Sequence, residues 1–357
     1  MQHGNGVFAE DIAQILSDEA IPWRDMQGAA VLVTGATGLI GAAIVRVLLA
    51  ANEKHGLGLQ IIGSGRDAEK SRRLLQAYGL DAFVQHDIRN PFPDGALPPK
   101  LDYIFHCAAM TGSADMVAKP VDVIMTAVDG TRHVLELAKG RHCRSMVYLS
   151  SMEVYGQTDL PEVRETDLGF LDLANPRASY PESKRLCESL CVAYAKQYGT
   201  PVAIARLAQT FGASTPTDDK RVFAQFARKA MAGEDIELHT QGNSRGNYCC
   251  TADAVRGLLT ILLKGSYGEA YNVANPDAST SIREMAHVVA SDVCGGRISV
   301  TVRVPDNIAE RGYAPDVGYR LNADKLKNLG WRPMYGLADM YTRMMADWRE
   351  AEAEAEG

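Results

Sequence analysis

Long apolar runs and secretory signals are missing from this sequence, and each absence excludes a class of protein. No apolar run approaches the roughly 20 residues that a helix needs to cross a bilayer. The segment Met1–Leu16 has neither the basic region nor the long apolar region of a secretory signal. We therefore expect a cytoplasmic protein with no membrane partner.

Positive charge is not in excess either. The chain of 357 residues has 37 Lys and Arg against 44 Asp and Glu, which gives a formal net charge of -7. Such a chain has no global positive field to attract nucleic acid. We therefore expect no nucleic-acid partner, and any phosphate-bearing ligand must be held by local features.

The seven cysteines form no C-x-x-C pair, and their number is odd. Cys187 and Cys191 share the face of a predicted helix, while Cys249 and Cys250 are adjacent in a predicted strand. Zinc sites and disulfide frameworks have more regular spacings. We expect reduced, mostly buried thiols and no metal ion.

What the sequence does contain, from Ala29 onward, is an alternation of short apolar runs and longer amphipathic segments. Repeated strand–helix alternation predicts an α/β fold with a Rossmann-type, doubly wound parallel sheet. Strands are predicted at 29–34, 59–65, 82–87, 101–109, 145–151 and 201–208, and helices at 38–54, 67–79, 121–140 and 180–199.

The segment VTGATGLIG lies between the first predicted strand and its helix. Gly35 permits a tight turn, Gly38 lets the backbone approach a pyrophosphate, and Gly41 allows close helix–strand packing. The free N–H groups at the helix N-terminus suit that anion. The segment predicts dinucleotide binding by Gly35, Thr37, Gly38, Leu39, Ile40 and Gly41.

The segment YPESK places Tyr180 and Lys184 on one face of a predicted helix. An ammonium beside a phenol favours the phenolate. Such a tyrosine can take the proton from a substrate hydroxyl while the attached carbon gives a hydride to a dinucleotide cofactor. Because Y-x-x-x-K is a common pattern, its position after a glycine-rich loop and a strand ending in two serines is what favours catalysis.

After Arg206 the alternation loosens, which predicts a second, smaller unit. We expect an N-terminal helix and lead-in at 1–27, a dinucleotide-binding domain at 28–205, a mixed α/β substrate lobe partly interleaved with it at 206–347, and an acidic tail at 348–357.

From about Ala29 to Pro333 the chain resembles the extended short-chain dehydrogenase/reductase family, in its nucleotide-sugar epimerase/dehydratase branch. The G-x-x-G-x-x-G spacing, the YPESK segment and LGWRP near the C-terminus are similar to family motifs. The resemblance implies that Ser151 joins Tyr180 and Lys184 in catalysis, by hydrogen-bonding the reacting oxygen. It also implies a homodimer formed by the helices that contain Thr126–Lys139 and Tyr180–Tyr198.

The resemblance implies further cofactor contacts. Asp87 and Ile88 match the position that contacts adenine, while Cys107, Ala108 and Ala109 match a motif that lies along the cofactor, with His106 in a structural role. In one departure, Ala127 stands where the family often has an asparagine near the cofactor.

The acidic residue that favours NAD at the end of the second strand is absent. Ser64 stands near that place, and Arg66 follows. We expect NAD as the cofactor, with NADP possible because Arg66 could pair with a 2′-phosphate.

The segment GNSRGNYCCTAD resembles a family segment whose arginine, here Arg245, contacts the diphosphate of the substrate. Gly246 replaces the usual aspartate and Thr251 the usual valine, and Gln209 stands where a substrate-binding asparagine is usual. Arg311 and Arg320 are further candidate partners for phosphate or carboxylate. The resemblance implies a nucleotide-diphosphate sugar as substrate.

The stretch YLSSMEVYG is the most informative about the reaction. The serine or threonine is followed by Asp-Glu in the family's 4,6-dehydratases and by Ser-Glu in UDP-glucuronate decarboxylases. Simple 4-epimerases generally lack an acidic residue there. This chain has Met152, which cannot donate a proton, and Glu153, the fourth expected catalytic residue. Arg177 precedes Tyr180 by three residues, which resembles the decarboxylases.

We therefore predict decarboxylation, or another step that enolises C5, on a nucleotide-linked uronic acid or hexose, with Met152 and Arg177 at the substrate. A C4 epimerase, a 4,6-dehydratase with altered acid chemistry and an NADPH-dependent ketosugar reductase remain open. A non-catalytic sensor of nucleotide sugars or dinucleotides is the alternative from another class. The joint presence of Ser151, Tyr180 and Lys184 argues against the sensor.

Overall fold

The computed structural model describes residues 6–72, 80, 82–304 and 318–356. At its centre lies a seven-stranded parallel sheet in the order β11-β7-β5-β4-β1-β2-β3. The strands are β1 (Ala30–Thr34), β2 (Gln60–Gly65), β3 (Ala82–Gln85), β4 (Tyr103–His106), β5 (Ser145–Ser151), β7 (Val202–Leu207) and β11 (Ala270–Val273). The predicted α/β fold with a doubly wound parallel sheet is confirmed.

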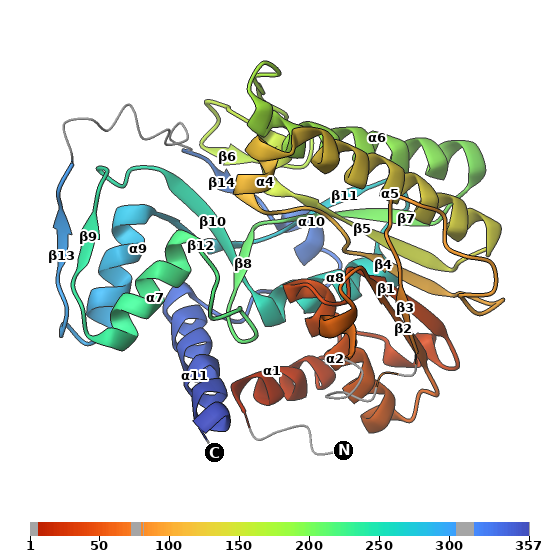
Figure 1. The fold of residues 1–357 in the computed structure, drawn as a ribbon, viewed down its shortest axis with the longest axis horizontal. Coiled ribbons are helices and arrows are strands. Elements are labelled where there is room, and N and C mark those ends of the chain that lie inside the picture. Colours follow the sequence, from red (N-terminus) through yellow and green to blue (C-terminus); the bar gives the residue numbers. More distant parts are fainter. Residues whose placement is uncertain (1–5, 73–79, 81, 305–317, 357) are drawn as a thin grey trace.

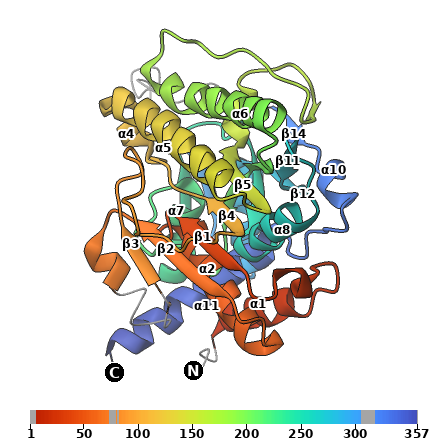
Figure 2. The same ribbon diagram turned by 90° about the vertical axis from the view of Figure 1, so that its right-hand side faces the viewer.

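Helices cover both faces of this sheet, which explains why its central strands are continuous apolar runs. On one face lie α4 (Ser113–Ala118), α5 (Pro120–Gly140) and α6 (Ser179–Tyr198), with α5 and α6 side by side (Figures 1 and 2). On the other lie α2 (Leu39–His55) and α8 (Thr251–Lys264), with α1 (Val7–Leu16) packed against both.

The smaller lobe is built on a three-stranded sheet in the order β12-β10-β8. Its strands are β8 (Gln209–Phe211), β10 (Arg245–Cys250) and β12 (Asn275–Ser281). Two strand pairs, β9 (Ile236–Leu238) with β13 (Val300–Val302) and β6 (Glu162–Val163) with β14 (Arg320–Leu321), and the helices α7 (Val222–Ala232), α9 (Ile282–Val288), α10 (Asp324–Lys327) and α11 (Leu337–Glu356) complete it. The lobe is interleaved with the main sheet, because β11 returns to pair with β7.

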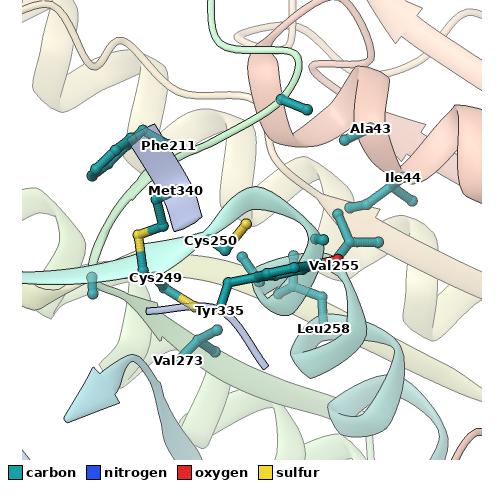
Figure 3. Close-up of a cluster of buried hydrophobic side chains, with 14 of the residues drawn as sticks. Ala43, Ile44, Phe211, Cys249, Cys250, Val255, Leu258, Val273, Tyr335 and Met340 are labelled. Carbon is teal, nitrogen blue, oxygen red and sulfur yellow. The ribbon is translucent and has the colours of Figure 1, made fainter. Parts of the chain in front are cut away.

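One hydrophobic core joins the two parts of the molecule. Figure 3 shows Ala43 and Ile44 of α2 near Val255 and Leu258 of α8, with side chains of β10 and of the C-terminal segment beside them. Cys249 and Cys250 lie in this core, and six of the seven cysteines are buried.

The structure departs from the sequence predictions near the C-terminus. The helix α11 continues to Glu356, through residues that we expected to form an acidic tail. Trp348 is buried within it and donates a hydrogen bond to the Thr215 carbonyl, and the Glu350 carboxylate accepts from the Val7 N–H at the start of α1. The helix predicted at 67–79 lies only partly within the described residues.

The strand order reverses between β1 and β4, where Thr34 is paired in register with His106. At such a point the connections leave the sheet in opposite directions, and a crevice opens at the carboxyl ends of the strands. Across the part of the chain that the structure describes, no helix is both long and apolar enough to span a membrane.

Candidate active site

The glycine-rich loop follows β1 at this crevice. Gly35 has φ of 65°, and a Cβ there would lie 2.8 Å from the Ala108 backbone nitrogen. A Cβ on Gly41 would collide with the Gly35 carbonyl oxygen, whereas one on Gly38 would meet only an ordinary contact at 3.4 Å. The fold itself therefore requires glycine at positions 35 and 41, and the space beside Gly38 is left for a ligand.

Gly38 is also the N-cap of α2, and no side chain caps this N-terminus or places a carboxylate in its first turn. The helix dipole and the first N–H groups thus face the crevice without a protein anion to satisfy them. This arrangement fits the pyrophosphate of a dinucleotide.

The end of β4 forms the next wall of the crevice. Both ring nitrogens of His106 have hydroxyl partners, Thr34 at 2.8 Å and Thr131 at 3.4 Å. Burial, with the field of Lys184, lowers the pKa of His106 to about 3. His106 is therefore a neutral residue that ties β4 to β1. Cys107, Ala108 and Ala109 follow it, and the Ala108 N–H donates to the Thr34 hydroxyl.

The candidate adenine side lies at the ends of β2 and β3. Ser64 is buried, and its carbonyl accepts from the Ala36 N–H, while Arg66 is exposed. Asp87 forms an ion pair with Arg89 at 2.6 Å, and this hydrogen bonding lowers the pKa of Asp87. Ile88 is buried against Gly130 of α5.

Ser151 and Tyr180 meet at the carboxyl end of β5. Ser151 ends the strand and caps a single 3-10 turn, Met152–Tyr155, by accepting from the Glu153 N–H at 3.2 Å. Its side chain also hydrogen-bonds Tyr180, which lies buried in the first turn of α6. Burial and then the Glu153 carboxylate raise the pKa of Tyr180 above its usual range, while the bond to Ser151 and the charge of Arg177 oppose this rise.

Lys184 lies one helical turn after Tyr180 and is also buried. Its ammonium donates to the Leu149 carbonyl at 2.6 Å and lies 5.8 Å from the centre of the Tyr180 ring. Burial lowers the pKa of Lys184. We predicted that this ammonium favours the Tyr180 phenolate; in the structure its hydrogen bond goes to the backbone of β5, and burial is the largest effect on the pKa of the phenol.

Glu153 and Arg177 form an ion pair at the same site. The distance between Arg177 NH1 and Glu153 Oε2 is 2.7 Å, and both side chains are about one-third exposed, at 38% and 33%. Arg177 belongs to a short turn that Asn175 caps. Met152, which we expected at the substrate, is buried in the hydrophobic core. Ser151, Glu153, Arg177 and Tyr180 therefore lie close together in one site, where the Glu153 carboxylate is partly exposed to solvent.

A separate cavity of about 570 Å³ lies in the smaller lobe, between the strand pair β6–β14 and the strands β10 and β12. Arg245 and Arg320 both line it, and Ser151, Tyr180 and Lys184 do not. Arg245 donates to the Ser279 carbonyl at 2.9 Å and pairs with Glu284 at 3.3 Å. Arg320 pairs with Glu162 at 2.5 Å. Gln209 lies in β8 beside Tyr248 of β10, and Arg311 lies outside the described residues.

Two residues that the sequence analysis did not single out, Asn247 and Tyr319, connect this cavity to the turn Met152–Tyr155. Asn247 is buried, donates to the Tyr319 carbonyl at 3.1 Å and accepts from the Leu321 N–H at 2.8 Å. The Tyr319 hydroxyl in turn donates to the Met152 carbonyl at 3.5 Å. Asn247 therefore fixes β14, which places Arg320 beside Arg245.

One sequence feature could have drawn attention to Asn247: its neighbour Gly246 replaces the aspartate that is usual in the family segment. The pairing of β10 with β12 shifts between Gly246 and Tyr248, as in a β-bulge. A Cβ at position 246 would collide with the Tyr248 phenol. The aspartate that is usual in the family segment therefore does not fit here without a shift of Tyr248.

Comparisons with known proteins show the family of the chain. Residues 31–274 match the sequence model of the NAD dependent epimerase/dehydratase family. The chain is 30% identical over 326 residues to UDP-glucuronic acid decarboxylase 6 of Arabidopsis thaliana, covering 89% of this chain and 88% of that relative. It is 28% identical over 329 residues to UDP-glucuronic acid decarboxylase 1 of Danio rerio, covering 91% and 74%.

Solved structures resemble it over similar lengths. The dTDP-glucose 4,6-dehydratase of Streptomyces venezuelae, solved with NAD bound, gives a TM-score of 0.72 at 26% identity, covering 91% of this chain and 98% of that one. UDP-glucuronic acid 4-epimerase of Bacillus cereus shares the fold, with a TM-score of 0.73 at 20% identity and coverage of 90% and 99%. The chain belongs to the NAD-dependent epimerase/dehydratase family of extended short-chain dehydrogenases/reductases and is an enzyme of this class.

Proposed function

We propose that this enzyme decarboxylates a nucleotide-diphosphate-linked hexuronic acid by way of a 4-keto sugar. The observation that supports this most is the Met152-Glu153 sequence, with Glu153 paired to Arg177 beside Tyr180. A general acid is missing at position 152, where a dehydratase needs one, while a carboxylate that a simple 4-epimerase does not need is present. The decarboxylase relatives support the same choice.

The first step uses Ser151 and Tyr180. The Tyr180 oxygen accepts the proton of the C4 hydroxyl, and the Ser151 hydroxyl hydrogen-bonds the reacting oxygen. NAD, which the glycine-rich loop would hold, would supply the reversible hydride acceptor for C4. The Arg177 charge and the Ser151 hydrogen bond both lower the pKa of Tyr180, against the effect of burial, and so favour the phenolate that this step requires.

The second step takes place at C5. With a ketone at C4, the C5–carboxylate bond can break, because the electron pair passes into the carbonyl as CO2 leaves. C5 then needs a proton. We assign its delivery to Glu153 in its carboxylic acid form, whose partly exposed side chain takes that proton from the solvent. Arg177 holds the Glu153 carboxylate through one N–H and has further donors for the carboxylate of the sugar.

The diphosphate of the substrate is assigned to the cavity lined by Arg245 and Arg320. Both arginines are already paired with carboxylates, Glu284 and Glu162 respectively, so a diphosphate would replace or share these partners. Gln209 and Arg311 are assigned to the substrate by resemblance alone.

The dinucleotide is proposed to be NAD, held by the loop Gly35–Gly41, with Asp87, Ile88 and Cys107–Ala109 along its path. NADP is the alternative, because Ser64 takes the place of an acidic residue and the exposed Arg66 follows it.

A C4 epimerase is the second candidate. The ion pair to Arg177 favours it, since a carboxylate already neutralised by a guanidinium can serve the loop structure alone. Incubation with UDP-, dTDP-, CDP- and GDP-linked hexuronic acids and hexoses, followed by product mass, separates the two. Loss of CO2 from a hexuronic acid is expected. Turnover with no change in mass would favour the epimerase, and loss of water the dehydratase.

The variant Glu153→Gln tests the assigned second step. We expect C4 oxidation to continue while product formation falls about 10²- to 10⁴-fold, so that reduced cofactor accumulates with substrate present. The absorbance of the reduced nicotinamide measures this. Glu237→Gln is the matched control, since Glu237 is a partly exposed carboxylate on β9. Wild-type turnover of Glu153→Gln would show that Glu153 has no catalytic role.

A further inference from the structure

Two arginines, Arg185 and Arg206, donate hydrogen bonds to the turn that contains Glu153, and neither has a role in the chemistry proposed above. Arg185, on α6, donates from Nε to the Val154 carbonyl at 2.7 Å and from NH2 to the Gly169 carbonyl at 2.8 Å. Its third nitrogen pairs with Glu182 at 3.2 Å. Arg185 thus connects α6 to the backbone directly after Glu153.

Arg206, on β7, contacts the next residue of the turn. Its NH1 donates to the Tyr155 hydroxyl at 3.0 Å and to the Glu165 carbonyl at 2.7 Å. The Tyr155 hydroxyl donates onward to Asn272 Oδ1 at 2.6 Å. The remaining Arg206 nitrogens form a buried ion pair with Glu188 at 2.7 Å.

The two catalytic residues of this segment are therefore held by different means. Ser151 is the last residue of β5 and is paired with Leu207 in the parallel sheet, so the strand fixes it. The chain leaves the sheet at Met152 and forms a 3-10 turn, whose start is capped by Ser151 through the Glu153 N–H. The part of the turn after Glu153 is held by Arg185 at the Val154 carbonyl, by Arg206 at the Tyr155 hydroxyl and by the Gly169 N–H at the Tyr155 carbonyl.

We propose that Arg185 and Arg206, here called the arginine clamp, are positioning residues that aim Glu153 at C5 of the sugar. The proposal rests on the proposed function, because it needs Glu153 to act at C5. A displacement of about 1 Å of a catalytic group costs on the order of 10²-fold in rate. Loosening the clamp slows the C5 step and spares the oxidation at C4, which depends on Ser151 and Tyr180.

The variant Arg185→Met tests the clamp with little risk to folding, since Arg185 is only partly buried. We expect the first appearance of reduced cofactor to stay within about 3-fold of wild type, and release of the final product to slow about 10- to 100-fold. Reduced cofactor then accumulates during turnover. Arg185→Lys can reach one of the two carbonyls and is expected to restore part of the rate.

Arg206→Met leaves Glu188 buried without its partner and is expected to fold poorly. Tyr155→Phe is therefore the second variant, because it removes the hydroxyl that Arg206 and Asn272 share and little else. The control is Arg228→Met, which removes a partly buried arginine that likewise donates to two backbone carbonyls, those of Thr217 and Asp219, in another part of the fold. It is expected to lower the melting temperature without any accumulation of reduced cofactor.

Glu153→Gln is measured beside these variants, so that the two proposals fail separately. Accumulation in Glu153→Gln, Arg185→Met and Tyr155→Phe, with none in Arg228→Met, supports the clamp. Accumulation in Glu153→Gln together with wild-type behaviour in Arg185→Met and Tyr155→Phe overturns the clamp alone. Wild-type behaviour of Glu153→Gln overturns the role of Glu153, and the clamp proposal with it.

Discussion

At the scale of single residues, Tyr180 shows how the surroundings of a side chain determine its chemistry. Burial makes its phenolate costly, and the nearby Glu153 carboxylate adds to the cost. The Ser151 hydrogen bond and the Arg177 charge act in the opposite direction. The reactivity of the phenol is therefore a property of a group of four side chains.

The variant Tyr180→Phe removes the proton acceptor and retains the ring. We expect kcat to fall about 10²- to 10⁴-fold while dinucleotide binding, measured by fluorescence titration, stays within about 3-fold of wild type. Tyr198→Phe, at the exposed end of the same helix, is the matched control and should leave both unchanged. Retention of half the activity by Tyr180→Phe would exclude it as the acceptor.

Residue-scale prediction from the sequence succeeds where local spacing determines the geometry. Tyr180 and Lys184 lie one helical turn apart, and Ser151 lies at the end of its strand, as the pattern indicates. The pairing of Glu153 with Arg177 was not predicted, because it depends on how the loop between β5 and α6 folds back. Asn247 was missed because its partners, Tyr319 and Leu321, lie more than 70 residues away.

At the scale of elements, the unit β1–α2–β2 combines a glycine-rich loop, which we propose holds the pyrophosphate, with a strand end that lacks the acidic residue usual for NAD. No carboxylate ends β2, and Arg66 is the exposed charge that follows it. A guanidinium there can pair with a 2′-phosphate and gains less from a neutral 2′-hydroxyl.

The variant Arg66→Ala is therefore expected to weaken NADP binding about tenfold, the value of one charge-assisted hydrogen bond. NAD binding should stay within about twofold of wild type, as the same bond is not made to the 2′-hydroxyl. Lys70→Ala, a nearby exposed cation, is the control for the loss of one positive charge. Equal losses for both dinucleotides would show that Arg66 stacks on adenine or has no cofactor role.

Most elements of the sheet could be predicted because a parallel strand covered on both faces is an uninterrupted apolar run. This holds for β1, β5 and β7, whose predicted and observed bounds agree within one or two residues. The two-residue strands β6 and β14 were not predicted, since their pairing brings together residues about 160 positions apart. Short strands of this kind carry no periodicity from which to infer them.

At the scale of the whole molecule, α1 connects the two ends of the chain. It lies before the region that matches the family and packs against α2, α8 and α11. Asp18, which follows it, pairs with Arg256 of α8, and Asp11 pairs with Arg343 of α11 at 2.7 Å. Asp11 and Arg256 are buried at the contact between the sheet and the smaller lobe, and Asp18 and Arg343 are partly buried there. Protonation of Asp11 therefore changes the charge at this contact.

Asp11 makes this effect measurable. Burial raises its pKa from 3.8 to about 6, although Arg343 and the Tyr335 hydroxyl lower it. The folded protein therefore binds the Asp11 proton more tightly than the unfolded chain does. This contribution to stability is complete below the unfolded pKa and is lost as the pH rises through the folded pKa.

Asp11→Asn keeps the size of the side chain and cannot titrate. Relative to this variant, we expect the free energy of unfolding of the wild type to fall by on the order of 2 kcal/mol between about pH 4 and pH 7. Urea titrations across that range measure it, since all other titrating groups are shared. Glu10→Gln, the exposed neighbour that also contacts Arg343, should give a curve parallel to wild type. Parallel curves for wild type and Asp11→Asn would instead show that the pairing with Arg343 fully offsets the burial of the carboxylate.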